Sequence, residues 1–442
     1  MKLKKTTMML AVAGVLFTGE DSNATNWLEL QGTEGPNSGR VKVWGFLQPT
    51  YQNDFSDISS FTAAAPPPEP TRIGPNLENQ SQFQLLRARI GVRGTPIPGD
   101  RRLNYFILSD FGHNGATDGG PLSERTPVRL MDASVTLNYI PHARIRAGLF
   151  KTPGSEELLQ GIVSLDYINF TWVGNQLLLE RYGKLATPST AGGGYVFDSS
   201  FGAARDTGIQ IFDWFHTGNW VHTYAVMVGN GHGLAPGQNM YRGQNTPGKD
   251  SYLYWSSERV YGGKGPFQEG WKTYVWWQSG QRYFDATDDG NAYNGMKHDR
   301  TRRGIGTRYR KSAWRAAAEY ITGKGMIFQG PEKPNFSIGP YSDLEGSSNG
   351  YYLDLGYYLP NTKWEIDLRY DVYNRSKDNP YIAAEFKGTT IGVQYHLSRT
   401  SRVTINYEIR SASPTGSTPF PILSTALDAI GNRLSMQLTT IF

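Results

Sequence analysis

The chain has 442 residues, and its 44 Lys+Arg against 39 Asp+Glu leave a formal net charge of +5. It contains no cysteine, which excludes disulfides, thiolate metal sites, iron–sulfur clusters, covalently attached haem and cysteine nucleophiles. Hydrophobic residues make up 38% of the chain, yet 13% is aromatic and 51 residues are glycine, a composition typical of strands and turns.

The N-terminus has the three parts of an export signal. A lysine-rich start is followed by an apolar run over 8–17, and small residues precede and include Ala24. We expect cleavage after Ala24, so that residues 1–24 are a signal peptide and residues 25–442 are the mature chain. A retained anchor helix is the alternative, although the run is short for a membrane span. No later apolar run approaches the length of a transmembrane helix.

Alternation of apolar and polar residues predicts β-strands along the rest of the chain. The clear stretches are 40–51, 86–93, 103–111, 129–139, 143–149, 362–372, 401–410 and 434–442, and weaker ones lie near 204–213, 219–230, 251–261, 269–282, 302–311, 313–323, 349–359 and 388–397. Such strands, joined alternately by tight turns such as Pro141-His142 and by long polar connections, are typical of outer-membrane barrels. The fold class we predict is therefore all-β, a transmembrane antiparallel barrel of about 16 strands surrounded by outer-membrane lipid.

The alternation also assigns a face to each residue of these strands. On the apolar, lipid-facing side we expect Met131 in stretch 129–139 and Leu149 in stretch 143–149. The opposite face collects arginine, which would cost ~2–4 kcal/mol at the bilayer midplane and is therefore expected in the lumen. These lumen arginines are Arg87, Arg89, Arg93, Arg144, Arg146, Arg308, Arg310 and Arg315.

A row of inward arginines is a candidate anion pathway, because guanidinium stays charged and binds oxyanions through two parallel hydrogen bonds. Anion pores are lined in this way. The later strands carry acids on the same face, namely Glu319, Glu365, Asp367, Asp371 and Glu408. A weakly selective pore, in which the charges only shape a transverse field, is therefore the alternative.

The connection 151–205 is too long for an ordinary loop. Ser155 is a plausible helix N-cap and Gly161 a plausible stop, and an aromatic stretch follows over 167–179. We expect part of this connection to fold into the barrel and narrow the lumen, the alternative being a surface lid or a trimer-contact loop. Its candidate constriction residues are Lys151, Arg181 and Lys184.

Four short stretches resemble the phosphate-selective porin O and P family, over roughly residues 40–235. They are LRARIGVRG (86–94), AGLFKTP (147–153), RDTG (205–208) and VGNG (228–231). The resemblance implies a 16-stranded barrel, usually a homotrimer, with an inward loop and an arginine ladder that passes phosphate or polyphosphate. The positions that match the ladder are Arg87, Arg89 and Arg93, and Lys151 matches the start of the loop.

Together these features predict a porin in the bacterial outer membrane, a passive water-filled channel for small hydrophilic solutes that prefers inorganic anions such as phosphate or other oxyanions. None of the seven histidines stands in a spacing that signals a catalytic triad, so we do not expect an enzyme. We expect no cofactor, no metal site and no nucleic-acid partner. The alternatives are a general weakly selective porin, or a barrel scaffold for an electron-transfer or other outer-membrane complex.

Overall fold

The structure is a computed structural model. It describes residues 26–35, 38–57, 81–114, 128–179, 182–185, 195–198, 204–231, 249–263, 268–284, 296–328, 342–419 and 421–442. The expected signal peptide, residues 1–24, lies outside these residues, so its cleavage stays a prediction.

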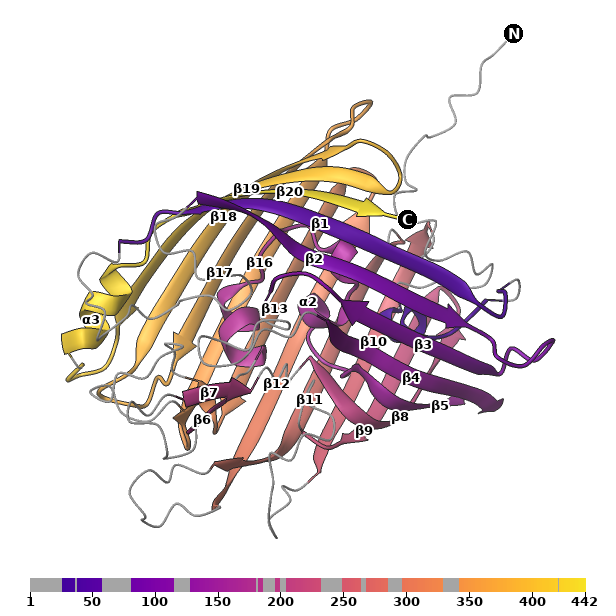
Figure 1. Cartoon of the computed structure of the whole chain (residues 1–442), viewed down its shortest axis with the longest axis horizontal. Helices are drawn as coiled ribbons and strands as arrows, with labels where there is room; N and C mark the ends of the chain where they lie inside the picture. The colour runs from indigo at the N-terminus through magenta and orange to yellow at the C-terminus, as the bar shows by residue number, and fades with distance from the viewer. Residues whose placement is uncertain are drawn as a thin grey trace.

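The described residues form one closed antiparallel barrel of 16 strands, as the alternation predicts (Figure 1). The first strand pairs with both its successor and the last strand, which closes the wall. In order around the barrel the strands are β1 (Lys42–Asp54), β2 (Ser81–Gly94), β3 (Leu103–Asp110), β4 (Arg129–Ile140), β5 (Ala143–Lys151), β8 (Arg205–Thr217), β9 (Trp220–Gly229), β10 (Asp250–Gly262), β11 (Glu269–Phe284), β12 (Met296–Lys311), β13 (Trp314–Lys324), β16 (Ser347–Tyr358), β17 (Trp364–Arg375), β18 (Ala384–His396), β19 (Ser401–Pro414) and β20 (Arg433–Ile441). Two further strand pairs stand apart from the wall, β6 (Tyr182–Leu185) with β7 (Tyr195–Asp198), and β14 (Ile327–Phe328) with β15 (Ser342–Asp343).

The barrel is inverted relative to a water-soluble protein, because apolar side chains cover its outside. On β19, Tyr407 and Ile409 are exposed, whereas Asn406 and Glu408, which alternate with them, are buried on the inner face. The same alternation runs along β17, where Ile366 is exposed. An apolar outer surface with polar residues inside is the arrangement that lipid selects.

No helix in the described part of the chain combines the length and the apolar character needed to cross a membrane.

The prediction for Met131 is wrong. Its side chain is fully buried in the apolar core inside the barrel, and the neighbouring Leu130 is exposed instead. The cause is a bulge in β4 at Met131 itself. Leu108 of β3 pairs with Asp132 and the next residue, Ser109, pairs with Leu130, so Met131 is left out of the pairing. A bulge of this kind moves the following side chains to the other face of the sheet.

The prediction for Leu149 is also wrong, because this side chain is buried in the same core. Residues 149–151 are buried in succession, so both faces of this end of β5 are covered. The alternation ends at Gly148, whose φ of +125° is a conformation that other residues rarely adopt. A Cβ atom there would lie 2.2 Å from the carbonyl oxygen of Ala133, so the close approach of the strands requires glycine.

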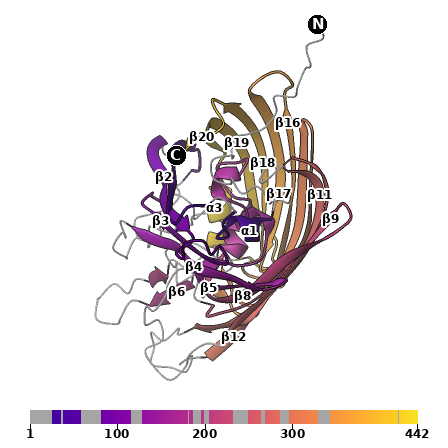
Figure 2. The same cartoon turned by 90° about the vertical axis from the view of Figure 1, so that its right-hand side faces the viewer.

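Three short helices accompany the wall. Two of them, α1 (Trp27–Leu30) and α2 (Glu156–Leu159), lie within the barrel, and α3 (Pro421–Asp428) lies at one mouth against β19 (Figures 1 and 2). Their apolar side chains join one buried cluster with the aromatic stretch that follows α2. This places part of connection 151–205 inside the barrel, as predicted.

Candidate functional site

The part of the connection that we call the inward segment, residues 152–179, leaves β5 and reaches the opposite wall. The hydroxyl of Tyr167 donates a hydrogen bond to Asp354 Oδ1 on β16, at 2.8 Å. The backbone N–H of Ile168 donates to Asn406 Oδ1 on β19, also at 2.8 Å. These two bonds join residues far apart in the chain, and they hold the segment across the lumen.

Apolar contacts fix the second half of the inward segment, which contains a π-helical turn at Gly174–Leu178. The ring of Trp172 lies 5.2 Å from that of Phe386 on β18, and Val173 is fully buried. The wall makes room for them with glycine. A Cβ at Gly350 would lie 2.7 Å from the Cβ of Val173, closer than ordinary packing permits.

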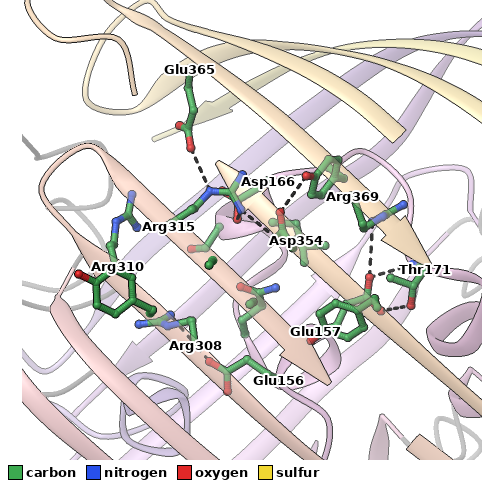
Figure 3. A pocket seen from close by; sticks show the side chains of 18 of the residues that line it. Glu156, Glu157, Asp166, Thr171, Arg308, Arg310, Arg315, Asp354, Glu365 and Arg369 are labelled. Carbon is green, nitrogen blue, oxygen red and sulfur yellow. Dashed lines mark hydrogen bonds and ion pairs between the residues drawn. The ribbon is translucent and has the colours of Figure 1, made fainter. Parts of the chain in front are cut away.

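Between the inward segment and the wall lies a cavity of about 80 Å³, enough for several water molecules (Figure 3). The segment contributes carboxylates to its lining, and strands β12, β13, β17 and β19 contribute guanidinium groups. The carboxylates on the segment are Glu156, Glu157 and Asp166. The guanidinium groups, which we call the late arginines, are Arg308, Arg310, Arg315, Arg369 and Arg402.

Glu156 lies at the cavity beside two cations of the barrel wall, Lys272 and Arg308. Its carboxylate accepts hydrogen bonds from Lys272 Nζ at 2.6 Å and from Trp27 Nε1 at 2.8 Å, and it lies 3.8 Å from Arg308. Burial opposes ionisation, but the charges of Lys272 and Arg308 and these hydrogen bonds hold the pKa of Glu156 below its usual value. Glu156 therefore remains a fixed negative charge.

Glu157 differs from its neighbour, since burial dominates and raises its pKa. Its carboxylate accepts hydrogen bonds from the Thr171 N–H at 2.8 Å and the Thr171 hydroxyl at 2.7 Å, and Arg369 lies 3.8 Å away (Figure 3). These contacts only partly offset the burial. Glu157 thus takes up a proton at a higher pH than a free glutamate.

Arg315 ties the inward segment to the wall. Its guanidinium lies 2.9 Å from Asp166 on the segment, 2.8 Å from Asp354 on β16 and 3.0 Å from Glu365 on β17 (Figure 3). It also donates a hydrogen bond to Asp367. With four carboxylates around one guanidinium, this group is a structural junction. Its donors are occupied by protein, so Arg315 borders the cavity without offering a vacant anion site.

Two of the late arginines were not among the predicted site residues. Arg369 Nη1 donates to the carbonyl of Asn169 at 2.9 Å, and Arg402 Nη2 donates to the carbonyls of Val163, at 3.2 Å, and Leu165. Both sit on the inner face that the alternation assigned to their strands, so that pattern could have identified them. Their contact with the inward segment has no signal in the sequence.

The predicted arginines of β2 and β5 lie elsewhere, and we call Arg87, Arg89, Arg93, Arg144 and Arg146 the early arginines. Their side chains point inward as predicted, but the residues that line the cavity do not include them. Arg89 pairs with Asp110 at 2.9 Å, and Arg144 with Asp213 at 3.4 Å. Arg87 donates to Gln48 Oε1 at 2.9 Å.

The structure describes two of the three predicted constriction residues. Lys151 is buried and donates through Nζ to the carbonyls of Leu158 at 2.8 Å, Leu159 at 3.3 Å and Gln160, which caps the end of α2. Arg181 lies outside the described residues. Lys184 lies on β6, paired in register with β7.

Comparison with known proteins supports the fold. No protein-family model matches the chain, and no curated protein matches it. An anion-selective porin from Comamonas acidovorans is similar with a TM-score of 0.52 and 14% identity, covering 92% of this chain and 100% of that one. Salmonella typhi OmpF in complex with daunomycin is similar with a TM-score of 0.56 and 11% identity, covering 91% of this chain and 97% of that one. Pseudomonas putida OprB is similar with a TM-score of 0.52 and 10% identity, covering 91% of this chain and 94% of that one. The chain therefore has the barrel fold of these porins, and its resemblance to the phosphate-selective family stays a prediction.

Proposed function

We propose that this protein is an outer-membrane porin, a passive water-filled channel for small hydrophilic solutes that prefers anions such as phosphate or other oxyanions. The observation that carries the proposal is the cavity between the acidic inward segment and the late arginines, inside a barrel that is apolar outside. A solute in this lumen is exposed to fixed charges of both signs. Transport of this kind makes and breaks no covalent bond.

The late arginines act through their permanent charge. A guanidinium remains protonated at every physiological pH and attracts a passing oxyanion even where its donors are bonded to protein. The carboxylates on the inward segment face them, so a solute crosses a field directed from wall to segment. Because this lining is largely shielded from bulk water, the field is stronger than the same charges would produce in solution.

A weakly selective channel is the second candidate, and the cavity itself favours it. Among the described residues, five arginines and five carboxylates line the cavity, together with His396, so the formal charges nearly cancel. Because burial raises the pKa of Glu157, acidification shifts this balance towards positive charge. Anion preference is therefore proposed as modest at neutral pH.

The test is a reversal potential, measured on the purified protein in a planar bilayer under a KCl gradient. A potential displaced towards that of chloride supports anion preference, and a value near zero supports the weakly selective channel. A potential displaced towards that of potassium contradicts our proposal. Subsequent addition of phosphate distinguishes a phosphate-binding lumen, in which phosphate lowers the chloride conductance, from a general anion channel.

We also propose that the channel is a homotrimer, with the outside of β1–β5 as its contact surface. Each exposed tryptophan of the described residues lies on β10–β17, at Trp255, Trp271, Trp277, Trp314 and Trp364. Tryptophan favours the membrane–water interface, so those strands suit lipid contact, and β1–β5 expose mainly aliphatic side chains. Chemical crosslinking in membranes followed by gel analysis tests this, and a monomer band alone would contradict it.

A further inference from the structure

The N-terminal segment, residues 26–35, lies inside the barrel and contains α1 (Figure 2). Trp27, Leu28 and Leu30 are 3%, 1% and 6% exposed, so the apolar side chains of this segment are buried inside the barrel. Trp27 donates to Glu156 at 2.8 Å and lines the cavity, and Gln31 Nε2 donates to the carbonyl of Leu159 at 2.5 Å. The segment therefore occupies space between the inward segment and the early strands.

Arg93 of β2 directs all its donor groups to the N-terminal segment. Its Nη1 donates to the carbonyl of Leu30 at 3.1 Å and its Nη2 to that of Thr33 at 2.7 Å, and its Nε pairs with the carboxylate of Glu34. The Arg93 side chain is 6% exposed and that of Glu34 is 5% exposed. The buried guanidinium of Arg93 thus binds the buried carboxylate of Glu34 in the way that a binding site binds a carboxylate ligand.

Arg146 of β5 completes the arrangement. It is fully buried, its Nη2 donates to the carbonyl of Leu28 at 2.6 Å, and its Nε donates to Thr136 Oγ1 at 3.2 Å. Its Nη1 has no hydrogen-bond partner in the described part of the chain. If the N-terminal segment left, Arg93 would lose its acceptors and Arg146 would keep one. A buried guanidinium that has lost its acceptors is strongly destabilised, so another anion would be needed to take their place.

We infer that Arg93 forms a binding site for monocarboxylate solutes, that Glu34 fills this site as a ligand tethered to the chain, and that Arg146 holds the same N-terminal segment through the Leu28 carbonyl. A soluble monocarboxylate competes with Glu34, and its binding releases the N-terminal segment from the lumen. Because Trp27 lines the cavity, the release widens the channel. This inference rests on the proposed function in one respect, since the solute must reach the site through the lumen.

The test uses the absence of native cysteine. Leu28→Cys places a single thiol on the buried face of the N-terminal segment, and Leu30→Cys is a second reporter if the first variant does not fold. The full-length protein in liposomes is labelled with a water-soluble maleimide in KCl and in potassium acetate of equal ionic strength. We expect labelling about tenfold faster in acetate, the scale of one charge-assisted hydrogen bond.

Two comparisons make this labelling specific. Glu34→Gln removes the tethered carboxylate and should accelerate labelling of Cys at position 28 about tenfold in KCl, with little further effect of acetate. Ala225→Cys, a buried site on β9 that is 1% exposed, should stay protected in both salts. Equal protection at position 28 in all conditions overturns the inference. Exposure of both positions also overturns it, because the barrel as a whole would then be loosening.

Measurements of conductance distinguish a failure of this inference from a failure of the proposed function. Glu34→Gln should raise the single-channel conductance in KCl about twofold, whereas Glu345→Gln, which removes the same charge from a side chain that is 84% exposed, should not. A conducting, anion-preferring protein whose N-terminal segment never becomes accessible overturns the inference alone. A segment that acetate releases in a protein without conductance supports the site and overturns the channel.

Discussion

The early and late arginines share the same chemistry and the same inward orientation, but they differ in what covers them. The late arginines border the cavity, whereas the early arginines are covered by the N-terminal segment or paired within the wall. Arg93, for example, binds two backbone carbonyls and Glu34. An inward arginine is therefore a necessary feature of an anion pathway and not a sufficient one.

The two regions also satisfy their buried charges differently. Around Arg315 the wall and the inward segment gather four carboxylates. Around Arg146 the acceptors are a hydroxyl and a backbone carbonyl, which carry no formal charge. The late region is therefore a network of compensating charges, whereas the early region contains, in Arg146, a buried positive charge whose hydrogen-bond acceptors are all neutral.

The largest effect should come from Arg315→Met, which tests whether the late network holds the structure together. It leaves four buried or half-buried carboxylates without their shared cation, so we expect a loss of about 3–5 kcal/mol in the free energy of unfolding. Urea unfolding of the protein in detergent measures this. Arg102→Met, which removes a surface pair with Asp100, should cost less than about 1 kcal/mol. Equal losses would show that the network has no special stabilising role.

An intermediate effect is expected on ion selectivity, which should depend on the late arginines more than on the early arginines. Arg308→Gln removes a charge at the cavity and should lower the anion-to-cation permeability ratio about threefold. Arg87→Gln removes the same charge from a side chain that is 2% exposed and away from the cavity, and should change the ratio by less than about 1.5-fold. Reversal potentials of both variants measure this. If Arg87→Gln has the larger effect, ions pass along the early strands and our comparison is wrong.

The smallest effect should be the pH dependence of selectivity. Since burial raises the pKa of Glu157, acidification neutralises this carboxylate before a free glutamate, while the arginines keep their charge. The permeability ratio should therefore shift towards anions, by about twofold, as the pH is lowered from neutral into the acidic range. Glu157→Gln should show the shifted ratio at both pH values. A pH dependence that persists in this variant would assign the titration to another group.

The strand pattern was predictable because alternation is a local property. A strand with one face in lipid and one in the lumen repeats every two residues, so single stretches such as 362–372 and 401–410 reveal both the strand and its faces. The same reasoning failed at Met131 and Leu149. A bulge and a glycine at positive φ change the face of a residue, and both depend on how neighbouring strands pair.

Alternation along the chain was therefore enough to predict the barrel, its strand number and the inward face of the arginines, and the length of connection 151–205 was enough to predict a segment inside. Which of the arginines meet the cavity could not be read from these patterns. That choice depends on contacts such as Trp27 with Glu156, which are 129 residues apart. Alternation reports the face on which a side chain lies, whereas access depends on what folds over that face, and this is settled by packing between distant parts of the chain.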